Sequence, residues 1–208
     1  MKIRVLWFLP VLIFSIVVTG CSPKARYERR LKKELASGVR NDSIFMGIYF
    51  GMGSMDFYTH CWMLNKNGLI RQGPSNTTVE CQLRKELKYP ATMNFYPTFE
   101  NAKIVEMPVE FVYTGWAPWN KKLSADSLQA DVLRWYKEKY EGDFMAVRHP
   151  KHGIAWVNIN GNRRITIFKQ DDMKVWAYFT DMLVKHDQTV VPPKNQITPG
   201  DTLNFPLK

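Results

Sequence analysis

Residues 154–169 read IAWVNINGNRRITIFK, two runs of β-branched and aromatic residues on either side of Asn160-Gly161. Strands favour such side chains, because they pack well on a pleated, half-buried surface. An Asn-Gly pair between two such runs is the strongest short-range signal of a β-hairpin, since both residues accept the left-handed backbone of a tight turn. The sequence therefore predicts strands at 154–159 and 164–169, joined at Asn160-Gly161 and paired antiparallel.

Segments of the same kind lie on both sides of this hairpin. Runs of β-forming residues predict further strands at 43–50, 77–84, 91–96, 103–114, 144–147 and 175–183. Pro108 lies inside the 103–114 run. Because proline lacks the N–H that a strand ladder needs, its presence predicts an edge strand or a bulge there.

Two helices are predicted between these strands. Apolar residues recur at the 3.6-residue period over 55–66, which predicts a helix with Ser54 as its N-cap. The same period follows Ser124 and ends at Gly142, which predicts a second helix. Several strands follow each helix. This order predicts an α+β fold of two halves, each a helix followed by antiparallel strands, that form a largely antiparallel sheet with the helices on one face.

The chain of 208 residues begins with a segment of another type. Lys2 and Arg4 precede an apolar run from Val5 to Val18, and small residues then lead to Cys21. This layout is typical of a secretory signal peptide, here residues 1–20. The apolar run is shorter than the ~20 residues that a membrane-spanning helix needs. An uncleaved N-terminal anchor helix is the alternative interpretation.

The end of this segment, Val18-Thr19-Gly20-Cys21, resembles the lipobox of bacterial lipoproteins. The resemblance implies that Cys21 is lipidated and becomes the first residue of the mature protein. Two or three acyl chains on one cysteine are enough for stable membrane anchoring. The residues after Cys21 are basic, whereas surface-displayed lipoproteins of Bacteroidota carry an acidic export tag there. The comparison favours a periplasm-facing protein of the bacterial cell envelope.

Cys21 is followed by three parts of different composition. Residues 21–42 are a basic tether that is expected to contact anionic membrane lipids. Residues 43–184 are expected to form one globular domain, and residues 185–208 a proline-rich flexible tail. The net charge of +10 also suits nucleic acid, but an exported protein rarely meets nucleic acid and the chain carries no motif for it, so no such partner is expected.

Two further resemblances concern the chain behind the leader. As a whole it resembles envelope lipoproteins of Bacteroidota, which implies an address and no activity. Phe50-Gly51-Met52, just before the first predicted helix, is similar to the strand–Gly–Met–helix start of BamE/SmpA lipoproteins. This similarity covers about 20 residues, and no function is transferred on it.

Once Cys21 is lipidated, Cys61 and Cys81 are the remaining cysteines. Export places them in a compartment that permits disulfides. A bridge between them would close a loop of about 20 residues and stabilise the fold by roughly 3 kcal/mol in the chain-entropy model. Two separately buried thiols are the alternative.

No group of residues predicts catalysis, and no metal or cofactor is expected. His60 and Cys61 are neighbours on a helix and point about 100° apart, so they cannot form a nucleophile–base pair. His149 and His152 could converge on a metal but lack a third ligand. Asp171-Asp172 suits a turn, and glycosidase chemistry would need two carboxyl groups held across a cleft.

The aromatic residues Trp116 and Trp119, in a loop with Pro118 and just after Tyr113, are the candidate partner-binding residues. Large rings anchor interfaces and stack on sugars. The alternative is that the tryptophans cap the core. We therefore expect a lipid-anchored envelope protein that binds a protein or glycan partner. A hydrolase acting on peptide or glycan is the second hypothesis.

A recurring Asp-Ser/Thr-apolar triplet is similar to the O-glycosylation acceptor of exported Bacteroidota proteins. It occurs at Asp42-Ser43-Ile44, Asp126-Ser127-Leu128 and Asp201-Thr202-Leu203. Helix-cap chemistry explains the second occurrence. Ser43 and Thr202 are therefore the candidate modification sites.

Overall fold

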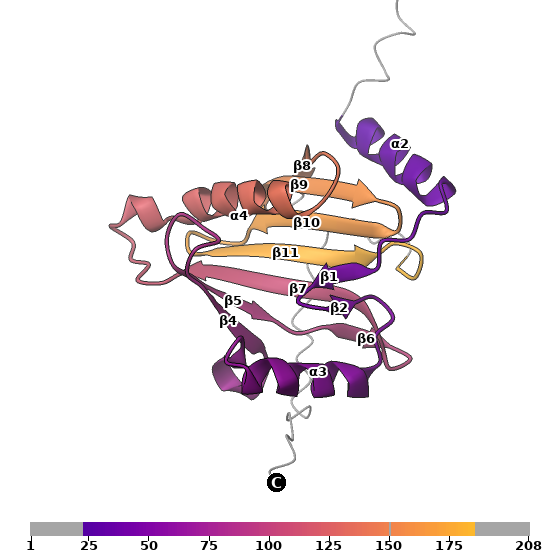
Figure 1. Ribbon diagram of the computed structural model, residues 1–208. Coiled ribbons are helices and arrows are strands. Elements are labelled where there is room, and N and C mark those ends of the chain that lie inside the picture. Colours follow the sequence, from indigo (N-terminus) through magenta and orange to yellow (C-terminus); the bar gives the residue numbers. More distant parts are fainter. Residues whose placement is uncertain (1–22, 150, 186–208) are drawn as a thin grey trace, which may run out of the picture.

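The computed structural model describes residues 23–149 and 151–185 (Figure 1). Within these ranges three α-helices pack on one large antiparallel sheet. The helices are α2 (Pro23–Ala36), α3 (Ser54–Lys66) and α4 (Ala125–Lys139). The strands of the large sheet are β3 (Arg71–Gln72), β4 (Val79–Leu83), β5 (Ala91–Phe95), β6 (Thr98–Glu100), β7 (Lys103–Tyr113), β8 (Met145–His149), β9 (Gly153–Asn160), β10 (Arg163–Lys169) and β11 (Lys174–Asp181). The predicted α+β class and the largely antiparallel sheet are confirmed.

The sheet order shows the two predicted halves. Its strands run β3-β4-β5-β7-β11-β10-β9-β8, with β6 paired to β7 beside β5. Each half is a helix followed by four strands in this path, α3 with β3, β4, β5 and β7, and α4 with β8 to β11. The last strand of each half meets the other at the centre, where Met107 pairs with Phe179 and Phe111 with Val175. The two halves therefore share one sheet and one core.

The β9–β10 hairpin forms as predicted, but its turn lies one residue later. Asn160 pairs with Arg163, so the two-residue loop is Gly161-Asn162. Gly161 has a φ of 59°, and Asn162 does not have a positive φ. A glycine with positive φ at the first central position is the pattern of a type II′ turn. The glycine, rather than the Asn-Gly pair, places the turn.

Pro108 lies at the centre of the sheet, and the prediction of an edge strand was wrong. β7 pairs with β11 on one side, where Pro108 is opposite Tyr178. On its other side β5 ends opposite Val109 and β6 begins opposite Glu106. Pro108 therefore falls where one neighbouring strand gives way to the next, and no ladder partner is opposite it on that side.

The segment 43–50 is also not the single strand that was predicted. It folds back on itself as β1 (Ser43–Phe45) and β2 (Ile48–Tyr49), a small separate sheet. The chain reverses at Met46 and Gly47, whose φ values are 51° and 80°. Two consecutive positive φ values are typical of a type I′ hairpin turn, which glycine accepts without strain.

One face of the sheet carries the main core under α3 and α4. In α3, Phe57 and Cys61 are buried, and the ring of Phe57 lies 5.9 Å from Phe99 of β6. In α4, Tyr136 is buried and its ring lies 6.1 Å from Phe111 of β7. Both helices thus lie on the same face, as predicted.

The starts of the two helices differ. At α4 the side chain of Ser124 accepts a hydrogen bond from the N–H of Ser127, as an N-cap does. At α3 the N-cap is Gly53, without a side-chain hydrogen bond, so the prediction of Ser54 as N-cap was wrong. The backbone N–H of Ser54 donates instead to the carbonyl of Ala102.

The third helix, α2, covers the opposite face at the β8–β9–β10 end of the sheet. Tyr27 packs in a second cluster with Val157 and Ile159. Its hydroxyl accepts a hydrogen bond from Nη1 of Arg164 at 2.9 Å. The segment 21–42 was expected to be a tether, but residues 23–36 form a helix packed on the domain.

Candidate functional site

The structure separates the three aromatic residues that were predicted to bind a partner. Tyr113 is 2% exposed, and its hydroxyl donates to Oδ2 of Asp131 at 2.6 Å. Burial, and then the hydrogen bond to Asp131, raises the pKa of Tyr113 well above its usual value. Trp116 is half-buried, with its indole N–H donating to the carbonyl of Asp172 at 3.1 Å. Trp119 alone is presented to a partner, with 84% exposure.

This corrects the expectation for Tyr113, which belongs to the core. A residue at the end of a strand looks the same in sequence whether its ring points into the core or out of it. The deciding contact comes from Asp131, 18 residues later in α4. No local pattern reveals that contact.

Cys61 and Cys81 are free thiols buried in the same core cluster, one in α3 and the other in β4. Burial raises the pKa of Cys61 to about 12. It also raises the pKa of Cys81, helped by Glu86 and Glu80. Because the thiolate is the nucleophile, neither thiol is prepared for chemistry in the folded state.

The candidate modification sites are placed differently. Ser43 is exposed in β1, and its carbonyl accepts a hydrogen bond from Nη1 of Arg163 at 2.7 Å. Cys21 and Thr202 lie outside the described residues, so their surroundings are not part of the structure presented.

The histidines do not form a metal site among the described residues. His149 is buried, and its Nδ1 accepts hydrogen bonds from the backbone N–H groups of Lys151 and His152 at 3.1 Å each. Its ring stacks on Phe168, with 5.0 Å between ring centroids. His60 contacts the carbonyl of Met46 through Nε2 at 2.6 Å. These histidines therefore have structural contacts.

The outer side of α3 is apolar, which was not predicted. Met55 is 74% exposed and Trp62 is 53% exposed. They are seven residues apart and so lie on the same side of the helix. We call α3 patch the exposed large apolar residues of α3 and of the segments joined to it: Met46, Tyr49, Met55, Trp62, Met63 and Leu69.

Two contacts join the parts of the α3 patch. His60 holds the carbonyl of Met46, which brings the β1–β2 turn to the flank of α3. The backbone N–H of Leu69 donates to the carbonyl of Leu64, so the chain folds back onto the helix end. The ammonium group of Lys66 lies over the ring of Trp62, 5.6 Å from its centroid.

The corresponding helix of the other half has a polar outer side. The exposed residues of α4 are Asp126, Ala130, Arg134, Lys137, Glu138 and Lys139. The two helices occupy equivalent places in the two halves, yet only α3 exposes large apolar side chains. Sequence could have revealed this difference, because Met55, Trp62 and Met63 fall outside the stripe of Phe57, Cys61 and Leu64.

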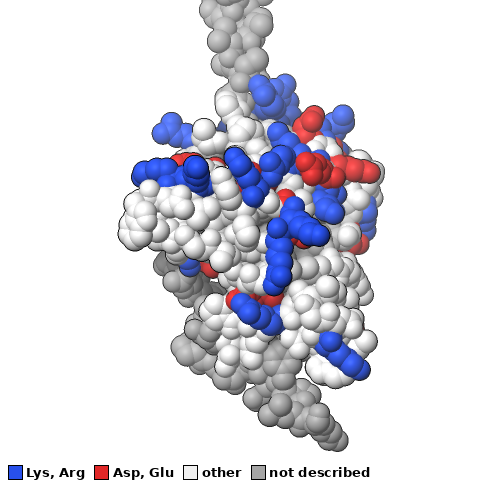
Figure 2. All heavy atoms as spheres, turned by 60° about the vertical axis from the view of Figure 1, so that its left-hand side comes forward, with Lys and Arg blue, Asp and Glu red and all other residues white. Residues whose placement is uncertain are grey.

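A third feature is the basic end of the molecule. Helix α2 contains six basic and two acidic residues. Residues 144–170, which include β8, β9 and β10, contain five basic residues and no Asp or Glu. Figure 2 shows Lys and Arg side chains gathered in the upper part of the molecule, around the start of α2.

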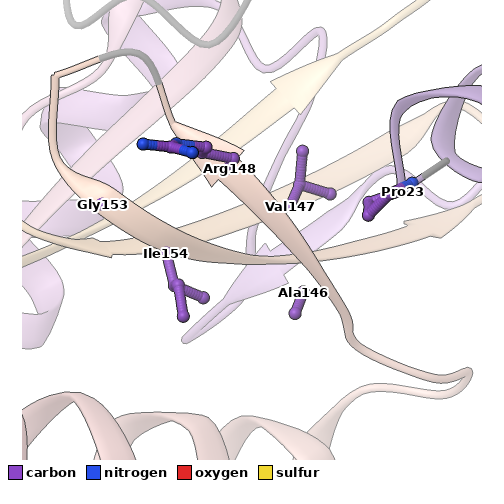
Figure 3. Close-up of a pocket in the computed structure, with 6 residues that line it drawn as sticks. All are labelled: Pro23, Ala146, Val147, Arg148, Gly153 and Ile154. Atoms are coloured by element: carbon purple, nitrogen blue, oxygen red, sulfur yellow. The ribbon is translucent and has the colours of Figure 1, made fainter.

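A shallow groove of about 430 Å³ lies at this basic end (Figure 3). Its lining is Pro23, Ala146, Val147, Arg148, Gly153 and Ile154. Arg148 is the one charged residue of this lining, and the lining holds no nucleophile and no acid–base pair. The groove therefore gives no support to the hydrolase hypothesis.

No helix within the described residues is long and apolar enough to cross a membrane. No protein-family model, no curated protein and no solved structure matches this chain.

Proposed function

We propose that this chain is a lipid-anchored protein of the bacterial cell envelope, held by Cys21 and facing the periplasm, whose domain binds a partner protein. The leader and its Val18-Thr19-Gly20-Cys21 end support the anchor. The α3 patch supports the partner. It is the observation on which the proposal depends.

The composition of the α3 patch is that of a protein interface. Aromatic residues, Met and Arg are enriched in interface cores, and tryptophan is the commonest energetic anchor. Methionine side chains adapt to the shape of an apolar partner surface. They offer no strong hydrogen-bond donor or acceptor to a sugar hydroxyl. These properties favour a protein over a glycan as the partner.

The position of the α3 patch suits a protein anchored at its N-terminus. Helix α2 packs on β8 and β9 at one end of the sheet, whereas α3 packs on β6 near the other end. Figure 1 shows α2 at the top of the molecule and α3 at the bottom. A partner can therefore reach the α3 patch without meeting the membrane that holds the chain.

The test is photo-crosslinking in native membranes with a crosslinker placed at Met63, followed by mass spectrometry of the product. The double variant Met55→Ala/Trp62→Ala should lower the yield of one identified adduct by at least about tenfold, since truncating an interface anchor costs 2 kcal/mol or more. Both side chains are exposed, so the melting temperature should stay near that of the wild type.

The matched control is Trp119→Ala, which removes an exposed tryptophan from the loop before α4. It should leave the adduct unchanged. If Trp119→Ala removes the adduct and the α3 variant does not, the partner binds the loop and the α3 patch is not the site. An adduct unchanged by both variants would also contradict the proposal.

A further inference from the structure

We infer that the end of the domain formed by α2 and the β8–β9 hairpin lies on the membrane surface and contacts anionic phospholipid headgroups, so that the domain is held in one orientation. We call this surface the α2–β8–β9 end and define it by Lys24, Arg26, Arg148, Lys151 and Ile154. The inference rests on the proposed anchor at Cys21 and adds a second, non-covalent contact to it.

The first step is that α2 is fixed to the domain. The hydroxyl of Tyr27 accepts from Arg164, and Oε2 of Glu34 accepts from the backbone N–H of Gly161 at 3.0 Å. These two contacts lie seven residues apart on the same side of the helix. A helix held at both places cannot swing freely, so the start of α2 has a set position on the domain.

The second step is the short distance from the anchor to the groove. Pro23, the first residue of α2, lines the groove together with Val147 and Ile154. Two residues separate Pro23 from Cys21, which is at most about 7 Å of chain. If Cys21 holds acyl chains in the bilayer, the groove must lie close to the headgroups.

The third step is the charge of this end. Arg148 and Lys151 are exposed on the β8–β9 hairpin, in a stretch without any acidic residue. Lys24 and Arg26 are exposed at the start of α2. Basic side chains near a surface of anionic lipid are attracted to it within a Debye length. The surface that the anchor brings to the bilayer thus has the complementary charge.

The fourth step is an apolar side chain among these charges. Ile154 is 59% exposed and stands opposite Arg148 in the β8–β9 ladder. An apolar residue flanked by basic ones is the arrangement with which interfacial segments enter the headgroup layer. Figure 3 shows Ile154 on the hairpin whose other strand carries Arg148.

The test uses the mature protein purified from membranes, with the mass of its N-terminus determined first. The variant Ile154→Cys carries an environment-sensitive fluorophore, and the protein is reconstituted in vesicles that contain phosphatidylglycerol and a headgroup nitroxide quencher. We expect strong quenching at position 154. It should fall severalfold in phosphatidylcholine vesicles or at high salt, because screening weakens contacts between exposed charges.

The matched position is Met55→Cys, labelled in the same way at the opposite end of the domain, where no quenching is expected. Equal quenching at both positions, or none at position 154, would overturn the inference. Wild-type protein treated with the label gives the background from Cys61 and Cys81, which are buried.

A charge variant completes the test. Arg148→Gln/Lys151→Gln should reduce the quenching at position 154, whereas Lys121→Gln/Lys122→Gln, at exposed lysines before α4, should leave it unchanged. If the N-terminal mass shows no acyl chains, the proposed anchor fails by itself. Sedimentation with phosphatidylglycerol vesicles then tests the surface alone. Affinity should fall about fivefold for each basic residue removed, and no binding would overturn the inference.

Discussion

Gly161 illustrates how a single residue connects distant segments. Its φ of 59° belongs to the left-handed region, which glycine enters without steric cost. A Cβ atom at this position would collide with the carbonyl oxygen of Val39, in the segment that follows α2. Gly161 is therefore needed both for the turn and for the close passage of that segment.

The variant Gly161→Ala should destabilise the domain by more than Gly115→Ala. Gly115 also has a positive φ, of 77°, but nothing lies near its Cβ position. The left-handed conformation alone costs roughly 1–2 kcal/mol for a residue with a Cβ. Urea unfolding of both variants measures the difference. Equal losses would show that the Val39 segment moves aside without cost.

Cys61 predicts how stability depends on pH. The pKa of its thiol is about 12 in the folded state, against an ordinary value of 9.0, because burial disfavours the thiolate. The unfolded chain therefore loses this proton at lower pH than the folded chain does. The contribution of the buried thiol is complete below pH 9.0 and is lost as the pH rises towards about 12.

We expect the free energy of unfolding to fall more steeply above pH 9.0 in the wild type than in Cys61→Ala. The difference in slope should approach about 1.4 kcal/mol per pH unit, the value for one proton. Buried tyrosines such as Tyr136 and Tyr140 shift the pKa in the same direction and remain in both proteins. Denaturant unfolding over this pH range measures both slopes. Parallel curves would show that water reaches the thiol.

At the scale of the element, α2 shows that charge alone does not reveal a tether. Its sequence is strongly basic, and a solvated helix or coil was expected from it. Tyr27 changes this outcome, because its ring is buried against Val157 and Ile159 while its hydroxyl meets Arg164. A single buried aromatic residue is enough to dock the helix.

The variant Tyr27→Ala should release α2 from the domain. Removing a large aromatic side chain from a packed site costs roughly 3–5 kcal/mol, more than the few other contacts of this helix can supply. Hydrogen exchange should show loss of amide protection over 23–36, with β9 and β10 still protected. Lys32→Ala, at an exposed position of the same helix, is the control. Protection retained in Tyr27→Ala would show that Leu31 and Glu34 hold the helix without it.

At the scale of the whole molecule, the two halves use one architecture for different purposes. Both place a helix on the same face of the sheet, and β7 and β11 join them at the centre. The outer side of α4 is charged, while that of α3 carries Met55 and Trp62. With α2 at the far end of the sheet, the molecule has a basic end for the membrane and an apolar patch for a partner.

The order of the elements followed from sequence because the signals are local. The 3.6-residue period over 55–66, the cap at Ser124 and the turn at Gly161 each depend on neighbours within a few residues. Such signals predict helices, strands and hairpins without knowledge of the fold. The same pattern, helix then strands and again helix then strands, was sufficient for the α+β class and the shared antiparallel sheet.

Tertiary structure alone decided which side chains remain exposed. Pro108 is tolerated at the centre because β5 ends where β6 begins, Tyr113 is buried by Asp131, and α2 docks through Arg164. Each of these outcomes depends on residues far apart in sequence. The physical reason is that burial is a property of the packed arrangement, and a chain's local pattern does not contain the position of its distant partners.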